Sequence, residues 1–276
     1  MAPEPYYTGD CTTPAYQLRY NWTGWPSEGQ TLCEPDEPFF DELAQRWEGD
    51  GIRLLERRWS AKQVQTTASV KPSVAPQEFA KRMKGRLQHA LRKADMNVKF
   101  SRKLAMRTVG ETKTATVESY IENQVAKEPL ADPRFAEFLE QFTVAGQNGD
   151  LTEPTRTHSG RYWYNLHLVL VIRDRSRISD EQSLSTLRDG TLRIAELKGH
   201  RISRLSVMPD HLHLALRGNI EMSPQDIALN FMNNLAHLMR ISALWMPSYY
   251  VGSIGCYDMN AIRCGSAGSS PVARSV

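Results

Sequence analysis

The chain reads PQEFAKRMKGRLQHALR at residues 76–92 and PQDIALNFMNNLAHLMR at residues 224–240. The two stretches align without a gap at a separation of 148 residues, the distance from Pro76 to Pro224. Both begin with proline, which favours the first turn of a helix, and both carry apolar residues at helical spacing. An internal repeat of this length predicts that the two halves of the chain share one fold.

The repeat extends beyond these two helices. A strand-like run opens at Tyr16 and, at the same separation, another opens at Tyr164. After a shift of three residues, LAMRTVG at residues 104–110 matches YYVGSIG at residues 249–255. Each half is therefore expected to read strand, helix, strand, strand, helix, strand. A final helix is evident only in the first half.

This alternation predicts a mixed α/β (α+β) chain. We expect two ferredoxin-like antiparallel sheets, each covered by helices on one face, related by the internal repeat and packed as a pseudo-dimer. The expected organisation is a first repeat at residues 1–126, a linker at 127–160, a second repeat at 161–263 and a flexible tail at 264–276. Pro, Gly, Asn and Thr surround one short helical piece of the linker, residues 132–142.

The composition is that of a globular protein with a modest positive charge. Hydrophobic residues make up 41% and charged residues 24% of the 276 residues, and the formal net charge is +3. So small a charge does not itself indicate a nucleic-acid-binding protein, and any basic face has to be local. We expect one cluster on the first repeated helix to contact DNA, with a solvated helix face as the alternative. Its members are Lys81, Arg82, Lys84 and Arg86.

The sequence contains no pattern typical of a secreted or membrane protein. The four cysteines, Cys11, Cys33, Cys256 and Cys264, lack both the spacing of a zinc site and that of a compact disulfide framework. The N-terminus does not resemble a signal peptide, and no segment approaches the ~20 apolar residues of a membrane helix. We therefore expect a cytoplasmic protein that does not enter a membrane.

A histidine pair lies in the second half, within SRLSVMPDHLHLAL at residues 203–216. This run alternates like a strand, so His211 and His213 point to one face and can bind one cation. The alternative is a pair of sheet histidines satisfied by hydrogen bonds. At the equivalent positions the first half has Gln63 and Gln65.

MPDHLHL at residues 208–214 resembles the His-hydrophobe-His strand of the single-tyrosine HUH transposases, found in the smallest bacterial insertion sequences and their REP-associated relatives. YYVGSIG resembles the last sheet strand of that family. A helix with the nucleophilic tyrosine follows there, with a metal-ligating glutamine one turn later. In the second half, Gly265 stands where the tyrosine belongs. In the first half, TVGETKTATVESYIENQ at residues 108–124 resembles this passage, with Tyr120 and Gln124 at i, i+4 spacing.

The two halves thus lack complementary parts of the motif. Because family members build a composite site from two subunits, the resemblance implies one working site in this chain, with Tyr120 as the nucleophile. His211, His213 and Gln124 would complete the catalytic set as ligands of a divalent metal, Mg²⁺ or Mn²⁺. The alternatives are a half-buried aromatic residue for Tyr120 and a solvated amide for Gln124.

The resemblance implies a transposase that cleaves and rejoins single-stranded DNA through a 5′-phosphotyrosine intermediate. Its partner would be DNA with hairpins at the element ends, and it would act at the bacterial nucleoid. The pseudo-dimer is expected within one chain, with further self-association left open. Two other functions remain: a domesticated hairpin-DNA-binding protein that has lost catalysis, and a replication or transfer initiator that uses the same histidine strand.

Overall fold

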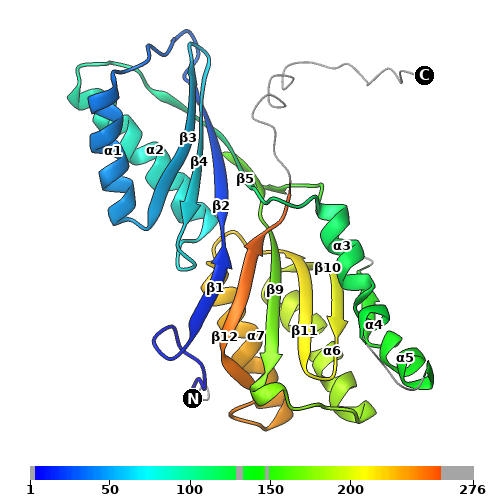
Figure 1. Cartoon of the computed structure of the whole chain (residues 1–276). Helices are drawn as coiled ribbons and strands as arrows, with labels where there is room; N and C mark the ends of the chain where they lie inside the picture. Colours follow the sequence, from blue (N-terminus) through cyan, green and yellow to red (C-terminus); the bar gives the residue numbers. More distant parts are fainter. Residues whose placement is uncertain (1–3, 129–132, 147–148, 256–276) are drawn as a thin grey trace, which may run out of the picture.

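The computed structural model describes residues 4–128, 133–146 and 149–255. It contains two six-stranded sheets, each with a pair of long helices packed against one face (Figure 1). No helix in the described ranges is long and apolar enough to cross a membrane.

The first unit is built from six elements that follow one another in the predicted order. They are β2 (Arg19–Pro26), α1 (Glu37–Gly49), β3 (Ile52–Ser60), β4 (Gln63–Val70), α2 (Pro76–Lys93) and β5 (Phe100–Thr108). The strands lie in the order β3-β4-β2-β5, and all three pairings are antiparallel. This is the ferredoxin-like arrangement that the sequence of elements predicts.

The second unit has the same order of elements and the same strand order. Its members are β9 (Asn165–Ile172), α6 (Glu181–Leu197), β10 (Arg201–Val207), β11 (His211–Arg217), α7 (Pro224–Met239) and β12 (Trp245–Ser253). The strands lie in the order β10-β11-β9-β12, again antiparallel. The two units therefore share one topology, and each of these elements of one has a counterpart in the other.

Strand pairing shows where the sequence repeat holds and where it slips. The helices α2 and α7 begin 148 residues apart, as do β4 and β11. Arg19 of β2 pairs with Ser69 of β4, and Asn165 of β9 pairs with Arg217 of β11, which lies 148 residues after Ser69. Arg19 and Asn165 are therefore counterparts, and the separation in the central strands is 146 residues. The alignment of Tyr16 with Tyr164 is therefore wrong by two residues, and Leu18 is the counterpart of Tyr164.

Each sheet is extended by a short strand that comes from the other half of the chain. β1 (Thr13–Gln17) runs parallel to β12 of the second unit, and β8 (Gly160–Trp163) runs parallel to β5 of the first. Each short strand then passes through one buried residue, Leu18 or Tyr164, into the central strand of its own unit. The exchange is reciprocal, so the two sheets are joined at both crossings.

Equivalent hydroxyl groups secure these crossings. The backbone N–H of Asn165 donates to the Thr108 Oγ1 at 3.1 Å, and the N–H of Arg19 donates to the Ser253 Oγ at 2.8 Å. Thr108 and Ser253 hold the same position at the ends of β5 and β12. Because a buried N–H without an acceptor costs about 1–3 kcal/mol, the two hydroxyls stabilise the junction between the units.

The segment predicted as a linker contains regular structure. The helical piece expected at residues 132–142 is α5, Pro133–Glu140. Downstream of it, β6 (Thr143–Ala145) pairs with β10, and β7 (Thr155–Arg156) pairs with β8. These short strands lie at the edges of the two sheets. The stretch 258–263 and the predicted tail at 264–276 lie outside the described residues.

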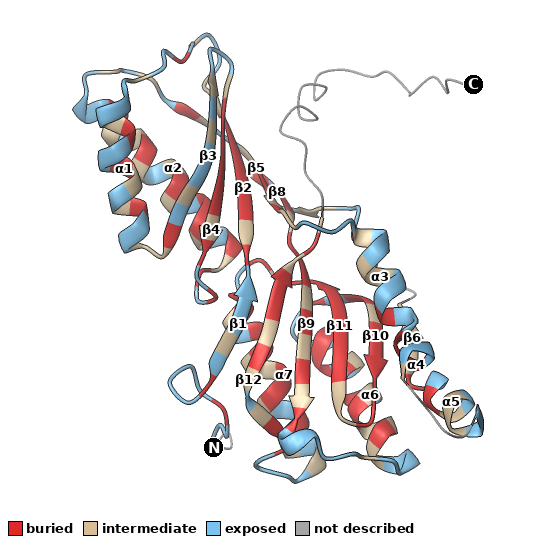
Figure 2. Ribbon diagram, in the orientation of Figure 1, coloured by how far each residue is buried: buried red, intermediate tan, exposed pale blue. Residues whose placement is uncertain are grey.

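One apolar core runs through the junction from unit to unit. It buries the helix-facing residues of both sheets (Figure 2). At the junction, the Tyr20 ring meets Phe79 and Tyr164 edge-on, with ring centroids 5.2 and 6.1 Å apart. Such aromatic pairs add about 0.5–1.5 kcal/mol each beyond the area that they bury. The core therefore fixes the two sheets relative to each other.

The close approach of backbones at the junction requires glycine at position 110. A Cβ atom there would lie 2.3 Å from the backbone carbonyl oxygen of Ser253, so Gly110→Ala is expected to destabilise the fold by about 1–3 kcal/mol. Gly85 is exposed on α2 with nothing within 4 Å of an added Cβ, so Gly85→Ala should stabilise by about 0.5–1 kcal/mol. Urea unfolding of both variants measures the difference. Equal effects would contradict the assigned contact.

The buried imidazole of His200 is expected to make the free energy of unfolding depend on pH. Burial lowers its pKa from 6.5 to about 4, and its Nδ1 accepts from the backbone N–H of Asn219 at 2.9 Å. The unfolded chain therefore binds more protons between these two pH values, and stability contributed by neutral His200 is lost as the pH falls from about 6.5 to 4. The loss should reach about 2–3 kcal/mol.

His200→Asn keeps an acceptor but cannot titrate in this range. Unfolding free energies of the wild type and of this variant, measured between pH 7 and pH 4, should converge as the pH falls. Parallel pH profiles would show that His200 is not the group responsible.

Candidate active site

The histidine pair predicted from the sequence lies at the start of β11. His211 and His213 stand two residues apart on one face of the strand, with ring centroids 4.9 Å apart. The Nδ1 of His211 lies 2.6 Å from the Asp210 carboxylate. Arg175 donates to the same carboxylate at 3.0 Å. These contacts fix the His211 ring through its Nδ1.

A third histidine, which the sequence analysis missed, joins the pair from the neighbouring strand. The Nε2 of His167 on β9 lies 3.1 Å from the Nδ1 of His213, and the two rings stack with centroids 5.3 Å apart. In the run NLHLVLVI, His167 interrupts a series of apolar residues, and this interruption is the feature by which the sequence could have indicated a functional residue. A single histidine in a strand is weak evidence without its partner across the sheet.

Burial keeps two of these imidazoles neutral. Burial first, and then electrostatic interaction with His167, His211 and Lys127, lowers the pKa of His213 to about 2, while Asp210 opposes the shift. Burial also lowers the pKa of His167, to about 4. Both rings therefore present lone pairs rather than positive charge near pH 7.

The helix that bears the predicted nucleophile crosses from the first half of the chain onto this face. α3 (Thr114–Glu122) packs against β10 and β11 of the second unit. The ring of Tyr120 lies edge-on to His213 and His167, with centroids 5.5 and 6.1 Å away. The Lys127 ammonium lies 3.6 Å from the centre of the phenol ring. Tyr120 itself is 43% exposed, which leaves it accessible to a large substrate.

Ion pairs and one small apolar cluster hold α3 in this position. Glu118 accepts a hydrogen bond from the Ser203 hydroxyl, and Arg204 pairs with Glu122. Ile121 is fully buried against Ala215, Leu151 and Ile254. Few side chains therefore attach the helix to the sheet, although the polar contacts are charge-assisted.

Gln124 lies close to Tyr120 but turns back on the helix. α3 ends at Glu122, and Gln124 begins a separate turn, α4 (Gln124–Lys127). Its side chain is only 6% exposed, and its Nε2 donates to the backbone carbonyl of Tyr120 at 2.6 Å. The sequence spacing predicted one continuous helix face, and the break at Asn123 changes the direction of this amide.

The four predicted DNA-binding cations lie on α2, where most of them have partners within the fold. Arg86 forms a bidentate pair with Asp50, and Arg82 pairs with Glu78 at 2.7 Å. Lys84 donates to the backbone carbonyl of Ser101 at 2.8 Å. Only Lys81 is largely exposed, at 3.9 Å from a Glu78 oxygen. These contacts indicate that three of the four serve the first unit's own stability.

The donor atoms around the histidines can be compared with the needs of a metal ion. In the described part of the chain, no group of three or more His, Cys, Asp or Glu side chains is arranged to hold one. His211 and His213 each engage Nδ1, with Asp210 and His167, which leaves Nε2 as the ring nitrogen for a ligand. Two imidazoles with the Gln124 amide oxygen suit Mn²⁺ or Mg²⁺, provided that this amide swings away from Tyr120.

Solved structures with detectable similarity include two transposases. One is a transposase from Deinococcus radiodurans R1, with 24% identity, a TM-score of 0.31, and coverage of 33% of this chain and 78% of that one. Another is a REP-associated tyrosine transposase bound to a REP hairpin, with 14% identity, a TM-score of 0.30, and coverage of 36% and 59%.

The regulatory subunit of aspartate kinase from Thermus thermophilus is also similar, with 9% identity, a TM-score of 0.20, and coverage of 80% of this chain and 93% of that one. TM-scores this low add no argument about function. No curated protein matches the chain.

The family match is confined to the second half of the sequence. Residues 161–264 match the model of the IS200-like transposases. This range contains β11 with both predicted histidines and His167 on β9, but neither Tyr120 nor Gln124. Over residues 161–264, this chain is therefore similar to the IS200-like transposases.

Proposed function

We propose that this chain cleaves and rejoins single-stranded DNA at one composite site, with Tyr120 from the first half and the histidines from the second. The observation that carries the proposal is the 5.5 Å between the ring centroids of Tyr120 and His213. These residues are far apart in the sequence and belong to different units. A helix that had no function at this face would not be expected to place an exposed phenol beside buried, neutral imidazoles.

The shared topology of the two units supports an origin as a fused pair. The reciprocal strands β1 and β8 would be the contact that two separate subunits once made, now within one chain. At the position equivalent to the histidine pair, the first unit carries Gln63 and Gln65 at the start of β4. One intact site and one silent site follow from this arrangement.

The chemistry proposed at Tyr120 is a transesterification. The phenol oxygen attacks the scissile phosphorus, a bond forms between them, and the bond from phosphorus to the 3′ oxygen breaks. The phenol gives up its proton and the departing 3′ oxygen gains one, so a 5′-phosphotyrosine and a 3′ hydroxyl result. The reverse reaction with a new 3′ hydroxyl rejoins the strand without ATP.

Phenols are poor nucleophiles at neutral pH, so the site has to favour the attack. When bound by His211, His213 and Gln124, a divalent cation such as Mg²⁺ or Mn²⁺ would polarise the scissile phosphate. Lys127 contributes a positive charge at the face of the Tyr120 ring, where it would attract the approaching phosphodiester. The substrate we propose is single-stranded DNA with hairpins at the element ends.

Removal of the Tyr120 hydroxyl tests the proposal directly. Tyr120→Phe should abolish covalent attachment of a labelled single-stranded oligonucleotide, read on a denaturing gel, while retardation of the same DNA on a native gel persists. Tyr16→Phe is the matched control, because Tyr16 is 46% exposed and lies on β1. Retardation without attachment in the wild type would instead identify a DNA-binding protein that has lost catalysis.

The contact between His167 and His213 predicts a positioning role for His167. His167→Ala should lower the cleavage rate and raise the Mn²⁺ concentration needed for half-maximal activity by roughly 10–100-fold, as expected for partners that orient metal ligands. His167→Gln retains a polar atom that can reach the His213 Nδ1 and should recover much of the loss. If His167→Ala slows cleavage without changing the Mn²⁺ requirement, His167 does not act through His213.

A further inference from the structure

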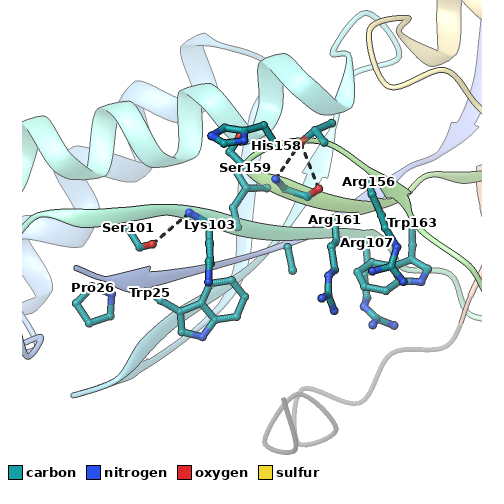
Figure 3. A pocket seen from close by; sticks show the side chains of 14 residues that line it. Trp25, Pro26, Ser101, Lys103, Arg107, Arg156, His158, Ser159, Arg161 and Trp163 are labelled. Carbon is teal, nitrogen blue, oxygen red and sulfur yellow. Dashed lines mark hydrogen bonds between the residues drawn. The ribbon is translucent and has the colours of Figure 1, made fainter. Parts of the chain in front are cut away.

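A groove of about 720 Å³ lies on the first sheet, and its lining contains none of His167, His211 and His213. Its walls come from β2, β5, β7 and β8 and from the turn between β7 and β8 (Figure 3). The cationic and large aromatic residues that line it are Trp25, Lys103, Arg107, Arg156, Arg161 and Trp163. None of the described residues that line the groove is acidic. A groove of this composition attracts an anion with flat, apolar parts.

The groove opens on the face that corresponds to the histidine face of the second sheet. Strand pairing places Gln65, Thr23, Ala105 and Arg161 directly beside one another across β4, β2, β5 and β8. Paired residues share one face of a sheet. Gln65 is the counterpart of His213, so both occupy equivalent faces, opposite the paired helices. The first unit has thus kept the face but changed its side chains.

The aromatic walls of the groove are held in defined positions. The guanidinium of Arg107 lies 3.6 Å from the centre of the Trp163 ring, and the Trp163 Nε1 donates to the backbone carbonyl of Thr152 at 2.7 Å. Trp25 lies where the register of β2 and β5 shifts, and such bulges redirect side chains. Lys103, Arg107, Arg161 and Trp163 extend from the same side of β5 and β8 (Figure 3). Together they combine stacking surfaces with positive charge.

A second cavity borders the groove and reaches the helix that carries Tyr120. This cavity, of about 410 Å³, shares Arg107 and Trp163 with the groove and extends to Lys113 and Thr114 at the beginning of α3. A polymer that occupied both would run from the first sheet to the base of the tyrosine helix. Two neighbouring cavities that share Arg107 and Trp163 suit a chain of nucleotides better than a small anion.

We propose that this groove binds a single-stranded segment of the DNA on which Tyr120 acts. Unpaired bases would stack on Trp25 and on the Trp163–Arg107 pair, and Lys103, Arg156 and Arg161 would contact the phosphates. Aromatic residues beside cations are the arrangement by which proteins hold single strands without reading their sequence. Duplex DNA does not offer exposed base faces to such walls. The identity of the polymer as DNA rests on the proposed function, while the groove itself does not.

Binding measured by fluorescence anisotropy tests the proposal. The probe is a labelled single-stranded oligonucleotide without hairpins, on the order of 15 nucleotides long, and the protein is the full chain with Tyr120→Phe, which forms no covalent link. Adding Lys103→Gln and Arg161→Gln should weaken binding and reduce the slope of log K against log salt by about 1.4, since each contact to a single strand contributes about 0.7. The charge-matched control is Arg193→Gln with Lys198→Gln, two exposed positions around α6, which should leave the slope unchanged.

A second variant tests the stacking surface separately from the charge. Trp25→Ala should raise the dissociation constant roughly 5–100-fold at an unchanged salt slope, and Trp25→Phe should recover most of that loss. Thermal melting of each variant checks that the fold is intact. If Trp25→Phe binds as poorly as Trp25→Ala, no base stacks there.

The proposal is overturned if the groove variants bind like the parent protein or lose no more than the α6 control. It is also overturned if a blunt duplex of equal length binds as tightly and depends on the same residues. Failure of the proposed function gives a different result, because a chain that never attaches to DNA covalently can still show the groove-dependent binding measured with Tyr120→Phe.

Discussion

Two short parallel strand pairings determine how this molecule is assembled. β1 joins β12, β8 joins β5, and a single buried residue separates each of these strands from the central strand of its own unit. The backbone at each crossing is satisfied by a hydroxyl, from Thr108 on one side and Ser253 on the other. Because the chain leaves β5 at this junction, α3 emerges beside the second sheet rather than above its own. The position of Tyr120 is thus a consequence of the crossing.

The open faces of the two sheets have taken on different chemical characters. The second presents imidazoles held by a carboxylate and by one another, beneath a helix from the other half. The first carries Gln65 at the position of His213, and indoles and cations elsewhere on the same face. In both units the helix-covered face forms the core, so it tolerates little change. The face opposite the helices carries polar residues such as Thr23, Gln65 and His213, which lie outside the apolar core, so it can change at less cost to core packing.

The sequence predicted the features that depend on local periodicity. The ungapped match of α2 with α7 and the i, i+2 spacing of His211 and His213 were enough to place the helices and the pair correctly. The proximity of Tyr120 to His213 also agrees with the expected meeting of the two halves. That expectation came from the family resemblance, since no spacing within the sequence could show that α3 crosses to the other sheet.

Features that depend on pairing between distant segments were missed. His167 gains significance only because β9 lies beside β11. The break at Leu18 falls inside a run that reads as one continuous strand, and Tyr164, where a run was expected to open, instead separates β8 from β9. The cations of the groove come from separate segments, so they form no run in the sequence. The conspicuous cluster at Lys81 to Arg86 does form one, but Asp50 and Glu78 neutralise much of it.

The outer strands of both sheets have features that hinder edge-to-edge pairing with other molecules. One sheet ends in β6, which has three residues, and the other in β7, which has two. The longer outer strand β3 carries Arg53, Glu56, Arg57 and Arg58, and β1 contains Pro14. Short strands, charges and proline are the devices by which sheet proteins prevent uncontrolled polymerisation. Because β1 and β8 occupy the positions beside β12 and β5 from within the chain, those two strand edges are not open to a second copy.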